Sequence, residues 1–203
     1  MTESAKLVLV VRHGESTWNA LSRWQGQADP PLSDLGERQA RAAIPTVAAL
    51  GLASLVSSDL VRARGTADLL APSDVTVTAE PAFRERNAGE WTGLTRAEIE
   101  ERDPGALAAR RNPPGFEGDE ALLARVLPAL EAIIAGLADG ACALVVSHGG
   151  VIGTLERHFG ERSAPLPNLS GRWFHGEGDG IVLGDRTRLI DADDVELTIP
   201  GQI

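Results

Sequence analysis

Two apolar segments constrain the fold more than any other feature of this sequence, because each is closely followed by a histidine and a glycine. The first, Leu7–Val11, is followed by Arg12-His13-Gly14, and the second, Ala141–Val146, by Ser147-His148-Gly149-Gly150. Both segments are short, continuously apolar and rich in β-branched residues, which is typical of strands covered on both faces in a parallel sheet. We therefore expect an α/β fold that brings both histidines to one edge of the sheet.

Weaker strand and helix patterns lie around these two segments. Further strands are predicted at Ala53–Val56 and, in a more exposed position, at Val75–Thr78. Helices are predicted to run from the capping residue Ser33 to Leu50, and at Asp59–Leu70, Glu120–Leu137 and Gly150–Phe159. Pro45 is expected to kink the first of these helices, and Pro128 is expected to weaken the third. The tail segments Gly180–Leu183 and Arg188–Ile190 are predicted to be antiparallel strands or turns.

This order of elements indicates the fold class. Strands that alternate with helices and end in an antiparallel edge predict a three-layer α/β/α architecture with a mostly parallel mixed central sheet. The 203 residues contain no internal repeat, low-complexity tract or linker-like stretch, so residues 1–203 are predicted to form a single domain. The order of the strands in the sheet cannot be read from the sequence.

Composition limits the partners of the chain. A formal net charge of −10 argues against binding to nucleic acids and to anionic membranes, because both require a cationic surface. An anion can bind such a chain only where arginines are concentrated locally. The single cysteine, Cys142, excludes an intramolecular disulfide and is interpreted as a small core residue. No segment resembles a signal peptide or a membrane span, so a cytoplasmic location is expected; a homodimer stays open.

His13 and His148 are the first candidates for chemistry. Because ligands of open α/β sheets bind at the carboxyl ends of parallel strands, both imidazoles are expected at one ligand site. The glycines that follow them allow backbone N–H groups to approach an anion closely, and the helix predicted to begin at Gly150 favours phosphate at its N-terminus. The alternative interpretation is that both are ordinary loop histidines. Two observations disfavour it: the same strand-His-Gly arrangement occurs twice, and Arg12 adjoins His13.

Two further segments carry groups that suit phosphate chemistry. In the first, Ser58 or Asp59 is expected to cap a helix that holds Arg62 in its first turn, where a cation opposes the helix dipole unless it faces an anion. In the second, Glu85 lies between Arg84 and Arg86 in a glycine-punctuated loop, where a carboxyl group can protonate a leaving oxygen. Taken alone, these segments are equally consistent with a solvated arginine and a surface ion pair.

Together, these residues resemble the histidine phosphatase superfamily, in its phosphoglycerate mutase-like branch. The matching blocks are RHGESTWN at 12–19, WQGQADPPLS at 24–33, SSDL at 57–60 with Arg62 and Thr66-Ala67, Arg84-Glu85 with GEW at 89–91 and Gly93, and SHGG at 147–150. The blocks occur in the family's order and extend to about residue 153, and the likeness is faint beyond residue 160. The combination is highly specific, whereas Arg-His-Gly alone is not.

The resemblance implies a role for each matching residue. His13 resembles the nucleophile that becomes phosphohistidine, Glu85 the general acid, and Arg12, Arg62 and His148 the remainder of the phosphate pocket. Residues that resemble the lining of the substrate entrance or of the anion site are Asn19, Gln25, Gly26 and Gly149. Such chemistry requires a neutral imidazole nucleophile and permanently charged guanidinium groups, but no metal ion and no cofactor.

The function predicted from these roles is hydrolysis of a small phosphorylated metabolite. A mutase is the first alternative, because Arg110-Arg111 before Pro113-Pro114 resemble the mutases' paired arginines, which could bind a substrate carboxylate. Against this, the region from Leu94 to Leu123 is short for a mutase, and Gly115–Glu120 departs from the family's usual Gly-Gly-Glu-Ser. A non-catalytic phospho-ligand-binding relative is the second alternative, although it would be expected to lack one of the five central residues. Metal hydrolase, P-loop and Gly-x-Ser-x-Gly motifs do not occur in the sequence.

Overall fold

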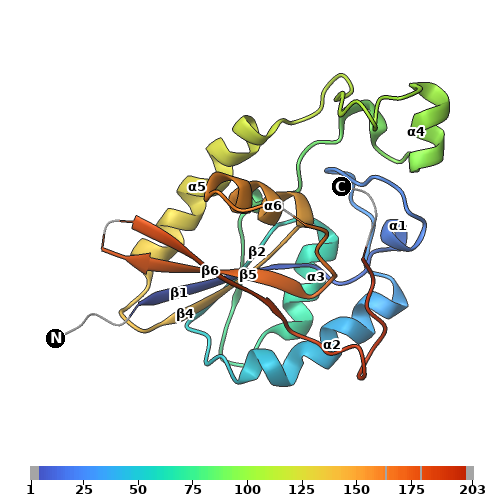
Figure 1. Ribbon diagram of the computed structural model, residues 1–203. Helices are drawn as coiled ribbons and strands as arrows, with labels where there is room; N and C mark the ends of the chain where they lie inside the picture. The colour runs from blue at the N-terminus through green and yellow to red at the C-terminus, as the bar shows by residue number, and fades with distance from the viewer. Residues whose placement is uncertain (1–4, 163, 179, 200–203) are drawn as a thin grey trace.

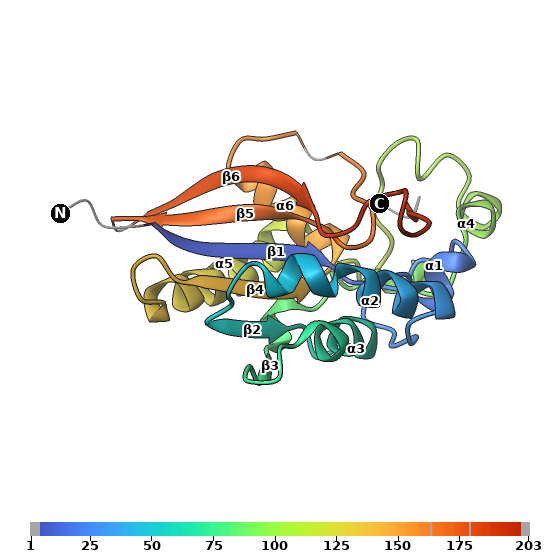
Figure 2. The ribbon, with the colours of Figure 1, turned by 90° about the horizontal axis from the view of Figure 1, so that it is seen from below.

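The computed structural model describes residues 5–162, 164–178 and 180–199, and its centre is a six-stranded sheet. The strands are β1 (Lys6–Arg12), β2 (Ser54–Ser57), β3 (Val77–Ala79), β4 (Cys142–Ser147), β5 (Ser170–Glu177) and β6 (Gly180–Arg188). Their order in the sheet is β3-β2-β4-β1-β5-β6, which is visible in Figure 2. β3, β2, β4 and β1 run parallel, whereas β5 and β6 are antiparallel to their neighbours. The predicted mostly parallel mixed sheet is confirmed.

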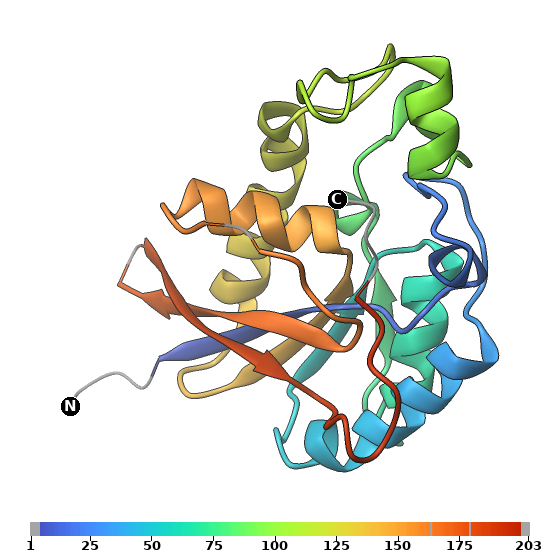
Figure 3. The same cartoon turned by 45° about the vertical axis from the view of Figure 1, so that its right-hand side comes forward.

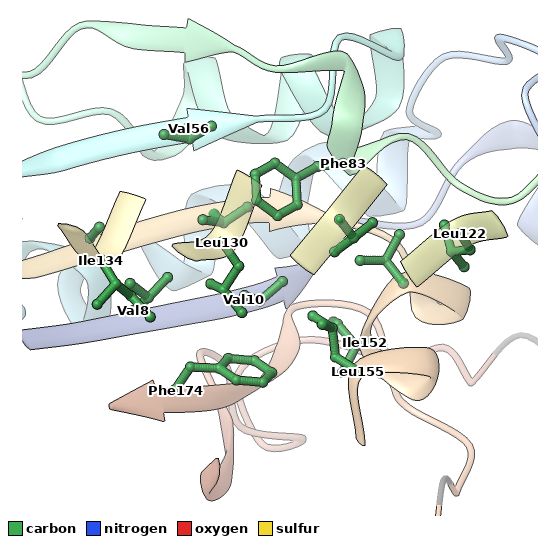
Figure 4. Packing of buried hydrophobic residues seen from close by; sticks show 14 of the residues in the cluster. Val8, Val10, Val56, Phe83, Leu122, Leu130, Ile134, Ile152, Leu155 and Phe174 are labelled. Atoms are coloured by element: carbon green, nitrogen blue, oxygen red, sulfur yellow. The ribbon is translucent and has the colours of Figure 1, made fainter. Parts of the chain in front are cut away.

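Helices cover both faces of this sheet (Figure 1). The α-helices are α1 (Thr17–Ala20), α2 (Asp34–Ala48), α3 (Val61–Leu70), α4 (Arg96–Arg102), α5 (Asp119–Gly136) and α6 (Gly149–His158), and the 3-10 helices are η1 (Pro81–Phe83) and η2 (Gly89–Trp91). On one face, α5 and α6 pack against Val8 and Val10 of β1 and Phe174 of β5 (Figure 4). On the other face, α2 and α3 pack against alternate residues of β1, such as Leu9 and Val11. Both faces of β1 are therefore buried, as its uninterrupted apolar sequence predicts.

The segments at the carboxyl ends of the parallel strands form a smaller cluster of their own. Trp24, Ala88, Trp91, Ile99 and Ala106 are buried together there. Ile99 belongs to α4, which lies away from the sheet (Figure 3). The rings of Trp24 and Trp91 meet edge to face with centroids 5.2 Å apart. None of the helices in the described ranges is long and apolar enough to cross a membrane.

Several element boundaries differ from those predicted. The exposed strand covers Val77–Ala79 rather than Val75–Thr78. β6 includes the first predicted tail segment and continues to Arg188, whereas Leu189 and Ile190 of the second predicted segment lie beyond its end. β5 was not predicted at all, because its polar sequence acquires strand character only through pairing with β1. Helices α2 and α5 continue beyond the prolines that they contain.

The prediction that Ser58 or Asp59 caps α3 is wrong. The residue at the cap is Leu60, without a capping side chain, and the N–H of Val61 instead donates to Asp29 Oδ1 at 2.6 Å. Ser58 follows the end of β2, and its N–H donates to the carbonyl oxygen of Val146 in β4. Asp59 binds Arg84 through both carboxylate oxygens. The Ser58 hydroxyl lies 2.9 Å from Nε2 of His148, so tertiary contacts use both side chains that local sequence would assign to the cap.

Candidate active site

The two strand-end histidines lie side by side. β1 and β4 are parallel neighbours with Arg12 opposite Ser147, and the His13 N–H extends this ladder by donating to the Ser147 carbonyl at 3.0 Å. The imidazole centroids are 5.1 Å apart. Both side chains are buried. The parallel pairing of two apolar strands therefore creates the histidine pair, as strand-end geometry predicts.

Local contacts determine the tautomer and charge of His13. Its Nδ1 lies 2.5 Å from the carbonyl oxygen of Gly14, so Nδ1 carries the proton and Nε2 carries the lone pair. Arg62 Nε donates to this Nε2 at 3.2 Å. Burial, followed by the positive charges of Arg62 and Arg12, holds the pKa of His13 well below its ordinary value of 6.5. His13 is therefore a neutral imidazole with a nucleophilic nitrogen at physiological pH.

Two buried arginines surround this nucleophile. In the described part of the chain, their guanidinium groups donate to carbonyl oxygens and to His13 rather than to carboxylates: Arg12 to Leu166, and Arg62 to Gly26 and Ala28. Burial, partly opposed by the charge of Glu85, lowers the pKa of each to about 10, so both remain cationic near pH 7. Buried cations of this kind are stabilised by a bound anion, and a phosphoryl group supplies one.

His148 and the helix that it precedes add further donors. The N-cap residue of α6, His148, makes no side-chain capping hydrogen bond in the described structure, so the first-turn N–H groups that Glu85 does not bind are available to a ligand. His148 Nε2 lies 2.9 Å from Ser58 Oγ, and its Nδ1 is buried without a hydrogen-bond partner in the described structure. Burial, followed by the charge of Arg62, holds the pKa of His148 well below its ordinary value.

The carboxyl group of Glu85 lies at the same helix N-terminus. Its Oε2 accepts from the Gly150 N–H at 2.9 Å, and its Oε1 from the Arg86 N–H at 2.7 Å. A Cβ at position 150 would lie 2.1 Å from Glu85 Oε1, so only glycine permits this approach. Glu85 lines the pocket around His13 with Arg12, Trp24, Gln25, Gly26, Arg62, Arg86 and Ala88.

The structure places the other predicted binding residues in three settings. Gln25 and Gly26 line the pocket itself, and Gly149, Arg110 and Arg111 line a larger cleft that opens beside it. The side chain of Arg111 is exposed and pairs with Asp103. The backbone of Arg110 adopts a positive φ of 52°. Asn19 is buried at the start of α1, where its Oδ1 accepts from the Ser16 N–H. Its place among substrate-binding residues stays a prediction.

Arg86 is a pocket residue that sequence reasoning missed. It lines both the pocket and the cleft, and its Nε is buried with no hydrogen-bond partner in the described ranges. Its Nη2 donates to Asp119 of α5 and to Thr154 of α6, and its Nη1 donates to the carbonyl oxygen of Glu117. Arg84, on the other side of Glu85, pairs with Asp59 outside the pocket. The two arginines look alike in the sequence, and only the path of the loop separates them.

Comparisons with known proteins agree with this geometry. The model of the histidine phosphatase superfamily (branch 1) matches residues 8–172. A glucosyl-3-phosphoglycerate phosphatase from Mycobacterium tuberculosis is 33% identical over 85% of this chain and 88% of its own length. A 2,3-bisphosphoglycerate-dependent phosphoglycerate mutase from Nitrobacter winogradskyi is 34% identical over 75% of this chain and 80% of its own.

A solved structure extends the comparison to the fold. A mycobacterial glucosyl-3-phosphoglycerate phosphatase in complex with VO3 superimposes with a TM-score of 0.81 and 30% identity, over 91% of this chain and 99% of that one. Sequence blocks, sheet topology and family match agree with one another. The chain therefore belongs to branch 1 of the histidine phosphatase superfamily.

Proposed function

We propose that this enzyme is a metal-independent phosphatase that hydrolyses a phosphomonoester metabolite through a phosphohistidine on His13. The observation that carries the proposal is the neutral His13 imidazole, whose Nε2 is the unprotonated ring nitrogen in a pocket that also contains Arg12, Arg62 and Glu85. Phosphoryl transfer through a phosphohistidine requires a nucleophile, fixed cations and a carboxyl group, and the pocket contains all of these.

The reaction has two steps. In the first, His13 Nε2 forms a bond to phosphorus while the ester P–O bond breaks, and protonated Glu85 gives its proton to the departing alkoxide. In the second, the Glu85 carboxylate takes a proton from water, whose oxygen forms a bond to phosphorus as the N–P bond breaks. This returns neutral His13 and protonated Glu85 and releases inorganic phosphate.

The surrounding donors stabilise the phosphoryl oxygens in both steps. Arg12 and Arg62 offer guanidinium N–H groups, and Arg62 would exchange its contact with His13 Nε2 for the phosphoryl group. Ser58 would donate to Nε2 of His148, which leaves the unpartnered Nδ1–H of that imidazole for a phosphoryl oxygen. The N-terminus of α6 adds those of its backbone N–H groups that Glu85 does not bind.

Hydrolysis is favoured over a mutase reaction for two reasons. The segment between the acid-bearing loop and α5 is short for a mutase, and the phosphatase relatives include one beyond the mycobacterial enzymes, a metal-independent phosphoserine phosphatase from Arabidopsis thaliana. Arg110 and Arg111 lie on the wall of the large cleft beside the pocket. This cleft would accommodate a bulky alcohol portion of the phosphomonoester. Glucosyl-3-phosphoglycerate, which the mycobacterial relatives are named for, is therefore the first substrate to test.

The proposal is tested by replacing His13. The variant His13→Ala should lose at least about a thousandfold in turnover of p-nitrophenyl phosphate, because the nucleophile is gone. The exposed His158 serves as a matched control, and His158→Ala should retain wild-type turnover. Wild-type enzyme quenched during turnover of labelled substrate should carry an acid-labile, base-stable phosphoryl group. A folded His13→Ala enzyme with normal turnover would refute the mechanism.

A substrate screen separates hydrolysis from transfer. Phosphorylated metabolites, including glucosyl-3-phosphoglycerate, would be incubated with and without 2,3-bisphosphoglycerate, and both phosphate release and phosphoryl transfer would be measured. Release without dependence on the bisphosphate is the expected result. Transfer faster than release would identify a mutase, and binding without either would identify a non-catalytic relative.

A further inference from the structure

The loop that carries Glu85 has no regular secondary structure to hold it. Glu85 lies between η1 and η2, and its carboxylate contacts only the N–H groups of Arg86 and Gly150 among the described hydrogen bonds. A general acid contributes fully only when its proton is held within hydrogen-bond distance of the leaving oxygen. Something outside the pocket must therefore hold the backbone of residues 82–87 in place.

Arg125 of α5 binds this backbone at three points. Its Nη1 donates to the carbonyl oxygens of Ala82 at 2.5 Å and Arg84 at 2.8 Å, and its Nη2 donates to the carbonyl of Glu85 at 3.1 Å. One planar guanidinium group thus spans the peptide units on both sides of the acid. A lysine ammonium at this position could not reproduce that fork-like geometry.

Glu117 completes the arrangement from the other end of the loop. Its two carboxylate oxygens accept from Nε and Nη2 of Arg125, both at 2.8 Å. It also exchanges two hydrogen bonds with Asn87, from the Asn87 N–H to its carboxylate and from its own N–H to the Asn87 carbonyl. Burial raises the pKa of Glu117, but the hydrogen bonds and charge of Arg125, together with the Asn87 N–H and the charge of Arg86, outweigh this and lower the pKa. The carboxylate therefore stays ionised at neutral pH.

The helix that carries Arg125 is anchored in the core. The neighbouring Leu122 and Val126 are buried against the sheet, together with Leu130 one turn further along α5 (Figure 4). A guanidinium group that is fixed on such a helix presents its donors at constant positions. The position of the loop, and with it that of the Glu85 carboxyl group, is then set by the core rather than by the loop.

We infer that Arg125 and Glu117 act as positioning residues that hold the general acid Glu85 in register with the leaving oxygen. This inference rests on the proposed function, because it assigns an effect on the proton transfer that Glu85 performs. Neither residue lines the pocket around His13. Their loss should therefore slow P–O cleavage most where the leaving group needs a proton, with little effect where it does not.

The test compares two aryl phosphates that differ mainly in the basicity of the leaving group. p-Nitrophenolate departs without much help, whereas the more basic phenolate of phenyl phosphate needs the acid. We would measure kcat/KM, which reports P–O cleavage, for both substrates with Glu85→Gln, Arg125→Lys and Glu117→Gln. We expect Arg125→Lys to lower kcat/KM for phenyl phosphate about tenfold more than for p-nitrophenyl phosphate, since misplacement by about 1 Å can cost up to about a hundredfold.

Arg186 provides a matched control. It forms a similar part-buried, two-pronged pair with Glu156 and also donates to a carbonyl oxygen, but it lies on β6, away from the acid loop. Arg186→Lys should change kcat/KM for both substrates by the same factor. Glu117→Gln, which keeps the size of the side chain, should show a smaller version of the Arg125→Lys effect, and thermal melting would confirm that each variant is folded.

The double variant Arg125→Lys/Glu85→Gln decides the mechanism. If Arg125 acts through Glu85, the double variant should show the substrate ratio of Glu85→Gln alone. Equal losses on both substrates for a folded Arg125→Lys enzyme would overturn the inference while leaving the proposed function intact, provided that Glu85→Gln itself discriminates between the substrates. If Glu85→Gln does not discriminate, Glu85 is not the general acid and the inference falls with that role, whereas the phosphohistidine on His13 is decided by the His13→Ala variant.

Discussion

At the scale of single residues, burial determines the protonation of the site. His13 and His148 are both enclosed, and both lie near Arg62. Desolvation and a neighbouring cation each disfavour the imidazolium form, so the two effects act in the same direction. The same burial leaves Arg12 and Arg62 charged, because a guanidinium pKa that falls to about 10 is still far above neutral pH. The pocket thus combines neutral imidazoles with permanent cations.

Stability should therefore fall as the pH is lowered. Unfolded histidines protonate near 6.5, whereas His13 and His148 do so well below that value in the native state. Between those values the unfolded chain binds more protons, so acid favours unfolding by up to about 1.4 kcal/mol per histidine for each pH unit below about 6.5. Urea unfolding at pH 7.5, 6.5 and 5.5 would measure the slope.

A pair of variants separates these histidines from the carboxylates, which also titrate. His148→Gln should reduce the slope of unfolding free energy against pH between 6.5 and 5.5, since one depressed histidine is removed. His158→Gln, which alters an exposed residue of α6, should leave the slope unchanged. An unaltered slope in the folded His148→Gln protein would mean that His148 is not held neutral.

At the scale of elements, the site depends on how closely the N-terminus of α6 approaches the acid loop. Gly150 lies in the first turn of α6, and its missing side chain leaves the space that the Glu85 carboxylate occupies. A similarly close approach occurs where Gly36, in the first turn of α2, meets the backbone of Glu15. Two helices are thus packed against catalytic loops at glycine positions, which keeps these loops in fixed places.

Gly150→Ala should uncouple activity from stability. A methyl group in a helical position costs no backbone strain, but it would displace the Glu85 carboxylate from the Gly150 N–H. We expect a loss of about tenfold or more in kcat/KM for phenyl phosphate, which is part of the contribution of a general acid. The melting temperature should fall little compared with that of a core substitution.

Gly136 in α5 is the matched control for this substitution. A Cβ at Gly136 would meet no atom within 4 Å, so Gly136→Ala should stabilise the protein by about 0.5–1 kcal/mol and leave kcat/KM unchanged. Wild-type turnover of phenyl phosphate by Gly150→Ala would show that the observed position of Glu85 is not the catalytic one.

At the scale of the whole molecule, sequence patterns predict the strands that lie in the centre better than those at the edge. β1 and β4 are recognisable because both of their faces are buried, so the runs Leu7–Val11 and Cys142–Val146 within them are entirely apolar. β5 (Ser170–Glu177) has polar or glycine residues at every position except Trp173 and Phe174, and it becomes a strand because it pairs with the edge of β1, which no local pattern reveals. Strand order likewise follows from packing between distant segments.

The candidate site divides in the same way. Arg12, His13 and His148 could be predicted because strand ends place them, and Arg62 and Glu85 because their blocks resemble those of a known family. Arg86 and Arg125 could not be predicted, because each acquires its role through contacts with segments far away in the sequence. The side-chain partners of Arg86 lie 33 and 68 residues away, and the loop carbonyl oxygens that Arg125 binds lie 40 to 43 residues away. Long-range contacts of irregular loops leave no periodic trace in the sequence.

The charge distribution of the whole molecule leads to a last prediction. The chain carries a formal net charge of −10, yet its pocket contains the buried cations Arg12 and Arg62. Inorganic phosphate should therefore bind in this pocket in preference to the rest of the surface. At a hundred times its Kd, phosphate should stabilise the fold by about 2.7 kcal/mol, which corresponds to a rise in melting temperature of roughly 5–10 °C for a chain of this size.

Variants of two arginines on α3 test where this anion binds. Arg62→Ala should be less stable without phosphate, since the carbonyls of Gly26 and Ala28 lose their donor, and should also lose most of the rise in melting temperature that phosphate produces. Arg64 lies on the same helix, its side chain is 41% exposed and it pairs with Asp68, so Arg64→Ala should retain the full rise. The comparison uses the difference with and without phosphate at constant ionic strength, which removes the intrinsic loss of stability. If Arg62→Ala shows the same rise as the wild type, the phosphate binds outside the pocket, and the buried cations require another explanation.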